Sequence, residues 1–204
     1  MRVVLSTYGS RGDVEPMVAL AVQLRALGAE VRVCAPPDFA DLFASVDVSL
    51  IPAGPSVRQM VRQVLTRAAP PSPEDLPRRV AELVAAQFDA VTAAADGCDA
   101  VVVVASGVTP AVAGARSVAE KRGIRYVHAT FCPVWLPSPH HRPLALPGRA
   151  FPTDVTDNRV LWQLEAQSLN AVFGGPISAH RASIGLPPVD DVRDRVFTLS
   201  LIHI

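Results

Sequence analysis

The sequence has no excess of charge of either sign and no long hydrophobic run. Its 204 residues carry 19 basic and 19 acidic side chains, and the sequence pI is near 7. It therefore lacks the basic surplus that is typical of nucleic-acid-binding proteins and the acidic excess of a disordered tail. The densest apolar stretch, Ala100 to Ala105, has the length of a strand, whereas a bilayer span needs roughly 20 apolar residues. We therefore expect no nucleic-acid partner and no stable membrane insertion.

Signals for secretion and for disulfide bonds are also scarce. Only Arg2 and a short apolar run precede the polar turn that begins at Thr7, which is not the pattern of a signal peptide. The three cysteines, Cys34, Cys98 and Cys132, are scattered, lack metal-ligand spacing and cannot all form disulfides. We interpret them as small buried side chains in a reducing compartment, and we expect a cytoplasmic protein.

Half of the residues are hydrophobic, which is enough for a sizeable core. Short apolar runs alternate with segments of helical periodicity. The predicted strands are 2–6, 30–34, 49–52, 99–105 and 125–130. The predicted helices begin near Val14 and end at Gly28, and then cover 39–45, 56–69, 75–95, 109–123 and 158–183, with an interruption at 174–176. This order predicts an α/β fold in which βαβ units form a parallel sheet with helices on both faces.

The last six residues, LSLIHI at 199–204, differ from the rest of the chain because they contain no Ala, Arg, Gly or Pro. One back-translation of this hexapeptide equals a transposon-end sequence that is used as an adapter in sequencing libraries. We therefore expect the native domain to cover 1–198 and the segment 199–204 to be a non-native tail. An ordinary terminal strand is the alternative, and a long read of the locus distinguishes the two.

The junction after the first predicted strand concentrates the residues that could perform chemistry. It reads GSRGDVEP from Gly9 to Pro16, and it matches neither the GxGxxG fingerprint of dinucleotide-binding folds nor a P-loop. In a doubly wound sheet, ligands bind beyond the carboxyl ends of the strands, and helix N-termini favour anions. Gly9 and Gly12 permit a close approach and a positive φ. Asp13 fits a helix N-cap or a functional carboxylate, and the two roles are compatible.

The stretch that starts with this junction, GSRGDVEPMVALAVQLRALGAEVRVCAPPDF, resembles the N-terminal, family 28-like domain of GT-B glycosyltransferases. Later segments are similar to the glycopeptide-antibiotic (vancomycin-group) glycosyltransferases. These segments are AAQFDAV, RSVAEKRGI, CPVWLPSPH, VTDNRVLW and HRASIGLPPV. The resemblance runs to about Val196 and implies a Rossmann-like fold, the acceptor-binding half of a GT-B enzyme.

The resemblance also implies roles for individual residues. Asp13 takes the position of the general base that acts on the acceptor hydroxyl, and Ser10 and Gly12 match loop positions that approach the diphosphate of the donor. The family uses a nucleoside-diphosphate sugar as co-substrate and no metal ion at the reacting centre, so we expect no metal site and no cofactor. A second Rossmann-like domain grips the sugar nucleotide in this family, and we expect that domain to be missing from the 204 residues.

The candidate acceptor-binding residues are Trp135, His140 and His141, which lie in the proline-rich loop over 133–152 and resemble the acceptor-loop region of the family. Helix and loop packing is the alternative for Trp135, and a solvated pair is the alternative for the two histidines. Two adjacent histidines alone are too few ligands for zinc. The plant and animal branch of the superfamily uses a histidine near the first strand as base; the nearest candidate here, His128, also fits a polar residue at a strand end.

The resemblance therefore implies an inverting glycosyltransferase that moves a hexose from a UDP- or dTDP-sugar to a hydroxyl of a small-molecule aglycone. The aglycone is expected to be a glycopeptide or another secondary metabolite, and the isolated chain is expected to be inactive as a transferase. Two alternatives stay open: a sterol or lipid glycosyltransferase, which shares the GSRGD junction, and a non-catalytic module that only binds an aglycone.

Overall fold

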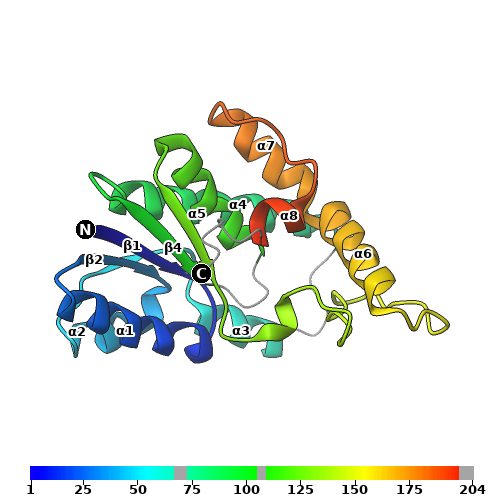
Figure 1. Ribbon diagram of the computed structural model, residues 1–204, viewed down its shortest axis with the longest axis horizontal. Helices are drawn as coiled ribbons and strands as arrows, with labels where there is room; N and C mark the ends of the chain where they lie inside the picture. Colours follow the sequence, from blue (N-terminus) through cyan, green and yellow to red (C-terminus); the bar gives the residue numbers. More distant parts are fainter. Residues whose placement is uncertain (67–72, 105–108, 198–204) are drawn as a thin grey trace.

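The computed structural model describes residues 1–66, 73–104 and 109–197. Its centre is a five-stranded sheet in the order β3-β2-β1-β4-β5 (Figure 1). All neighbouring strands are parallel, and β1 lies between β2 and β4, with Val3 opposite Val31 on one side and Ala100 on the other. The strands are β1 (Arg2–Thr7), β2 (Glu30–Ala35), β3 (Leu50–Pro52), β4 (Ala100–Val104) and β5 (Arg125–Ala129). The predicted α/β, Rossmann-like class is confirmed.

Helices cover both faces of the sheet, as its apolar strands require. On β1, Val4 faces the side of α4 and α5, whereas Val3 and Leu5 face α1, so that two separate cores form on the two faces. The helices are α1 (Arg11–Ala26), α2 (Ala40–Ala44), α3 (Val57–Thr66), α4 (Leu76–Ala94), α5 (Thr109–Arg122), α6 (Asn158–Leu169), α7 (Gly175–Ser183) and α8 (Val192–Phe197).

Most predicted elements agree with this list to within one or two residues at each end. The predicted interruption at 174–176 is wrong, because a wide π turn over Asn170–Gly174 carries the chain from α6 into α7 without leaving helical geometry. Pro176 falls in the first turn of α7, directly after the π turn, a position that tolerates its missing N–H. The short helix α8 was not predicted. Residues 67–69 of one predicted helix and the segment 199–204 lie outside the described residues.

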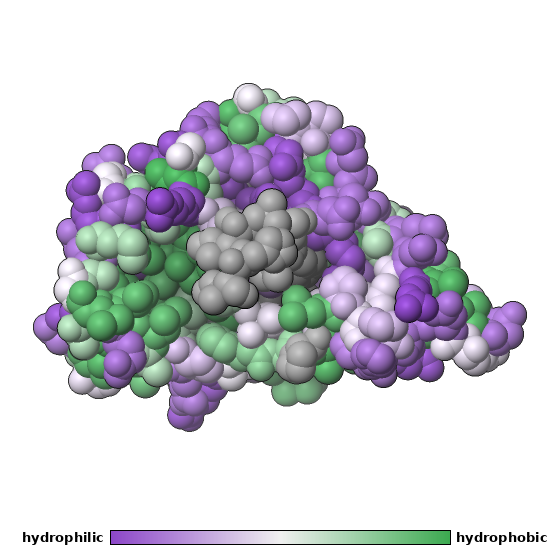
Figure 2. All heavy atoms as spheres, viewed as in Figure 1, coloured by the Kyte–Doolittle hydropathy of each residue, from purple (hydrophilic) through white to green (hydrophobic). Residues whose placement is uncertain are grey.

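The C-terminal segment folds back onto α4 and α5. His180 of α7 meets Phe88 of α4 edge to face, with 5.1 Å between the ring centroids. Arg181 is buried and pairs with Glu120 of α5 at 2.9 Å. In the view of Figure 2, hydrophobic residues gather over β1, β2 and α1, whereas hydrophilic residues cover most of the part that carries α6 and α7. The helix α7 therefore covers the α4–α5 face with a mostly polar outer surface.

The helices α4 and α5 approach each other closely at Gly114. A Cβ at Gly114 would overlap the carbonyl oxygen of Val84 and would lie 3.0 Å from Cβ of Gln87. Gln87 is completely buried and accepts a hydrogen bond from the Ser6 hydroxyl of β1 at 3.3 Å. The absence of a side chain at position 114 thus sets how close α4 lies to α5 and to the sheet.

We predict that Gly114→Ala destabilises the chain by about 1–3 kcal/mol, because the added methyl overpacks a dense contact. Gly175→Ala is the matched control: it is also helical, but no atom lies within 4 Å of its added Cβ. Urea unfolding followed by circular dichroism measures both variants. Equal stability of the two variants would contradict the close α4–α5 contact.

Candidate functional site

The Asp13 carboxylate lies at the first turn of α1, beyond the carboxyl end of β1. Asp13 is only 7% exposed, and its Oδ2 accepts a hydrogen bond of 2.9 Å from the Ser10 amide and one of 3.4 Å from the Ser10 hydroxyl. Ser10, not Asp13, is the N-cap, so the N-cap interpretation of Asp13 is wrong by three positions. The contact from the Ser10 amide to the residue at N3 is one half of a capping box, and it holds the carboxylate in one orientation.

The two glycines of the junction have different roles, and neither has the expected positive φ. A Cβ at Gly9 would overlap Oδ2 of Asp13 and would lie 2.6 Å from its Cγ. A Cβ at Gly12 would meet only the Ser10 hydroxyl, at 3.9 Å. Gly9 is therefore the residue that leaves space for the Asp13 carboxylate.

Ser10 and Gly12 are both exposed at the start of α1. The first amides of a helix point outward and carry partial positive charge, so this turn is chemically suited to an anionic group. Their contact with a donor diphosphate stays a prediction.

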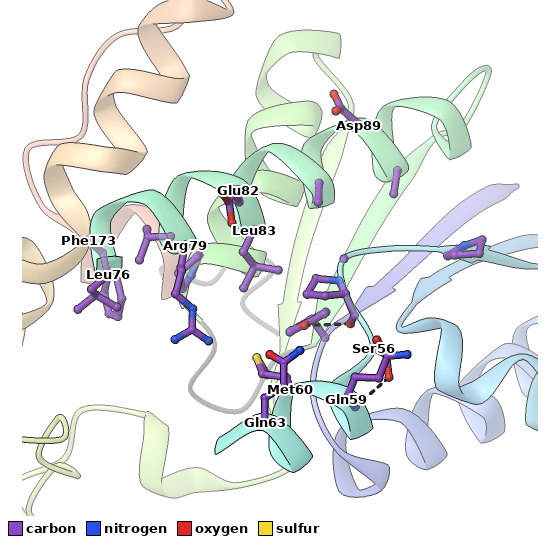
Figure 3. A pocket seen from close by; sticks show the side chains of 18 residues that line it. Ser56, Gln59, Met60, Gln63, Leu76, Arg79, Glu82, Leu83, Asp89 and Phe173 are labelled. Atoms are coloured by element: carbon purple, nitrogen blue, oxygen red, sulfur yellow. Dashed lines mark hydrogen bonds between the residues drawn. The ribbon is translucent and has the colours of Figure 1, made fainter. Parts of the chain in front are cut away.

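A cavity of about 860 Å³ opens beside this junction, between α3 and α4 (Figure 3). Arg79 and Leu83 point from α4 toward Met60 and Gln63 of α3. The lining is mostly apolar, and Tyr8, which directly precedes Gly9, forms part of it. The other described lining residues that Figure 3 labels are Ser56, Gln59, Leu76, Glu82, Asp89 and Phe173. The volume is that of a pocket for a drug-sized ligand.

Tyr8, a lining residue of this cavity, joins the chain that follows β1 to the chain that follows β3. Its hydroxyl donates a 3.1 Å hydrogen bond to the carbonyl oxygen of Pro55. Burial, with a contribution from the nearby Asp38 carboxylate, raises the pKa of Tyr8 to about 12, so the phenol keeps its proton at neutral pH. Gly54 has a φ of +71°, and a Cβ there would lie 2.6 Å from the Tyr8 ring. The chain after β3 is thus held against the chain after β1.

The predicted acceptor-binding residues gather elsewhere, around Trp162 of α6. The ring of His141 meets Trp162 edge to face with 5.6 Å between centroids, and Trp162 Nε1 donates to the carbonyl oxygens of Ser138 and His141 at 3.1 Å. His140 is exposed, and its amide donates to the Ser138 hydroxyl at 3.1 Å. None of the described residues that line the cavity comes from this loop.

A buried ion pair holds the Trp162 cluster in place. The guanidinium of Arg193 in α8 pairs with Glu165 of α6, lies 4.7 Å from the Trp162 ring centroid, and donates to the carbonyl oxygen of Trp135 at 3.3 Å. Burial raises the pKa of Glu165 despite this pairing. Trp135, His140 and His141 therefore belong to one loop that is fastened to α6 and α8, and their contact with an acceptor stays a prediction.

His128 lies near the end of β5 and is buried. Burial, with a smaller effect of the Arg116 charge, lowers the pKa of His128 to about 4, so its ring is neutral at pH 7. In residues 1–66, 73–104 and 109–197, no three His, Cys, Asp or Glu side chains are arranged to hold a metal ion. No helix in these same ranges is long and apolar enough to cross a membrane.

The sequence was compared with models of known protein families. Residues 3–138 match the model of the glycosyltransferase family 28 N-terminal domain. The chain belongs to this family. The predicted resemblance is therefore confirmed, and the GSRGD junction and all described lining residues of the cavity except Phe173 fall within the matched residues.

Relatives of known name agree with this assignment, and a solved structure has a similar fold. The chain is 50% identical over 198 residues to the glycosyltransferase GtfE of Amycolatopsis orientalis, covering 97% of this chain and 47% of that protein. It is 48% identical over 192 residues to the vancomycin aglycone glucosyltransferase of the same organism, covering 94% and 46%. The fold is similar to that of the Streptomyces sp. SF2575 glycosyltransferase SsfS6 complexed with thymidine diphosphate, with a TM-score of 0.55, 21% identity, and coverage of 92% and 46%. The chain thus spans about half the length of the curated relatives it matches.

We predict that Gly9→Ala displaces the Asp13 carboxylate, because the added methyl and Oδ2 cannot occupy the same space. The hydrogen bond to the Ser10 amide is then lost, at a cost of about 1 kcal/mol in unfolding free energy. Gly12→Ala is the control in the same turn and is expected to be neutral or slightly stabilising. Urea unfolding and a crystal structure of each variant check this; an undisturbed Asp13 in Gly9→Ala would refute it.

Proposed function

We propose that the full-length protein transfers a sugar from a nucleoside-diphosphate donor to a hydroxyl of a glycopeptide-like or other secondary-metabolite aglycone, with inversion at the anomeric carbon. The observation that carries this proposal is the buried Asp13 carboxylate in the loop and first turn that follow β1, directly after Tyr8, which lines a mostly apolar cavity. Tyr8 lines the cavity and is separated from Ser10 only by Gly9, so cavity and carboxylate share one loop.

The relatives support the substrate classes. One relative is named for a vancomycin aglycone as acceptor, and a structure of similar fold contains thymidine diphosphate. We infer from these names that this protein uses an aglycone of comparable size and a UDP- or dTDP-sugar, with hexose or deoxyhexose as the transferred group. The mostly apolar lining of the cavity is suited to the aglycone and not to the charged nucleotide.

Asp13 acts as the general base in this proposal. The acceptor oxygen forms a bond to the anomeric carbon while the bond between that carbon and the diphosphate oxygen breaks. The acceptor hydroxyl gives its proton to the Asp13 carboxylate, and the diphosphate leaves with the electron pair. The Ser10 amide orients the carboxylate through the 2.9 Å hydrogen bond. The exposed first turn of α1 around Gly12 offers partial positive charge to the leaving diphosphate.

We predict that Asp13→Asn lowers kcat of the full-length protein by about 100-fold or more, the usual scale for loss of a general base. An Asn side chain can still accept the hydrogen bond from the Ser10 amide, so the melting temperature is expected to change little. Asp41→Asn is the control, because Asp41 is exposed on α2. If Asp13→Asn keeps its turnover per folded molecule, Asp13 has only a structural role, as the N3 residue of the capping box with Ser10.

We further predict that the 204-residue chain binds vancomycin aglycone but transfers no sugar, because the reaction requires both substrates to be held together. Calorimetric titration with the aglycone, with a sterol and with UDP- and dTDP-glucose measures binding, and mass spectrometry of a mixture measures transfer. Detectable transfer by the monomeric chain, or micromolar binding of the nucleotide sugar, would overturn the assignment as the acceptor half. Binding of the sterol alone would point to a lipid acceptor.

A further inference from the structure

The two walls of the cavity are anchored very differently. One face of α4 is packed into the core through Val80, Val84 and Val91. By contrast, none of the described side chains of α3 is buried, and Val61 and Leu65 are 49% and 79% exposed. Apolar packing, which usually holds an amphipathic helix in place, therefore contributes little to the position of α3.

The N-terminus of α3 is instead held by one carboxylate, that of Asp38, in the turn that follows β2. Asp38 Oδ1 accepts a 2.6 Å hydrogen bond from the Ser56 hydroxyl, and Oδ2 accepts one of 2.8 Å from the Val57 amide. A longer bond of 3.3 Å comes from the Arg58 amide. The Ser56 hydroxyl in turn accepts the Gln59 amide at 3.1 Å. Several amides of the first turn of α3 are thus satisfied directly or indirectly by Asp38.

The charge of Asp38 suits this arrangement. Burial alone would raise the pKa of Asp38, but the hydrogen bonds from Ser56, Val57 and Arg58 stabilise the carboxylate and lower it below the usual value. Hydrogen bonds to a charged acceptor are stronger than those between neutral groups. A negative charge at a helix N-terminus also interacts favourably with the helix dipole. The carboxylate is therefore ionised at neutral pH and holds α3 through its first turn.

We call the hydrogen bonds that Asp38 accepts from Ser56, Val57 and Arg58 the clamp. One side of the chain from Ser56 into α3 faces the cavity. Ser56, Gln59, Met60 and Gln63 line the cavity at helical spacing, and Figure 3 shows Met60 and Gln63 opposite Leu83 and Arg79 of α4. A change in the direction of α3 at its N-terminus would therefore move the whole wall.

We propose that Asp38 is a positioning residue for the acceptor: by holding the N-terminus of α3, it sets the shape of the cavity and hence the affinity for the aglycone. This inference rests on the proposed function for the identity of the ligand, but the clamp itself does not. Asp38 is not among the described residues that line the cavity. In the proposed reaction it does not contact the reacting atoms. Its effect is expected on acceptor binding and not on the chemical step.

Hydrogen–deuterium exchange of the 204-residue chain tests the clamp without any ligand. In Asp38→Ala we expect exchange over Val57–Thr66 to rise about tenfold, the scale of a lost N-cap interaction, while α4 and β1 keep their protection. Asp38→Asn retains an acceptor oxygen and is expected to be intermediate. Asp41→Ala changes an exposed carboxylate in the next helix and is the matched control. Unchanged exchange in α3 of Asp38→Ala would overturn the clamp.

Calorimetric titration of the same proteins with vancomycin aglycone tests the effect on affinity. We expect Kd to rise roughly tenfold in Asp38→Ala and to stay unchanged in Asp41→Ala. The melting temperature of Asp38→Ala should be only a few degrees below that of Asp41→Ala, the scale of one lost capping interaction. In the full-length protein, KM for the aglycone should rise while kcat is retained, and Asp38→Asn should restore part of the loss.

The possible failures are distinguishable. Faster exchange in α3 with an unchanged Kd would show that the clamp has only a structural role and would overturn the positioning of the acceptor. A fall in kcat without a rise in KM would do the same. If the wild-type chain binds no aglycone, the proposed function and the effect on affinity both fail, whereas the exchange result still decides whether Asp38 holds α3.

Discussion

The close packing of α4 against α5 and the sheet is the constraint on which the candidate site depends. Because Gly114 of α5 has no side chain, α4 can lie close to α5. The buried Gln87 of α4 accepts a hydrogen bond from the Ser6 hydroxyl of β1. With one face buried in this way, the opposite face of α4 projects beyond the strands and becomes one wall of the cavity. Because the five strands are parallel, their following loops emerge at the same edge, which brings this wall to the loop that carries Asp13.

The site therefore combines a rigid half with a more weakly held half. The Asp13 carboxylate is placed by the cap of α1 and by the space that Gly9 leaves, and α4 is placed by the core. None of the described side chains of the opposite wall, α3, is buried, and the first turn of α3 is held by hydrogen bonds to Asp38. This division suits the proposed function, since the wall could change with the aglycone while the Asp13 carboxylate, the proposed base, stays in place.

The sequence alone predicted the strands and most helices, because apolar runs and helical periodicity extend over whole elements. It also placed Asp13 at the start of a helix, but the structure assigns the N-cap to Ser10: the first turn, from Arg11 to Asp13, is polar and precedes the apolar pattern that starts at Val14. The residues that line the cavity were not predicted as a set, since Tyr8, Met60, Leu83 and Phe173 come together only through tertiary packing. Likewise, no local pattern shows that Arg193 and Trp162 fasten the loop of Trp135 and His141 to α6.

The central claim is that the aglycone binds between α3 and α4, and methyl NMR of the three methionines tests it most directly. Met60 lines the cavity, Met17 of α1 is buried in the core between α1 and the sheet, and Met1 is exposed at the N-terminus. With ¹³C-methyl methionine in the 204-residue chain and a titration of vancomycin aglycone, the account predicts a saturable shift of the Met60 methyl resonance while those of Met17 and Met1 stay in place. Saturable binding that leaves the Met60 resonance unmoved would contradict the account.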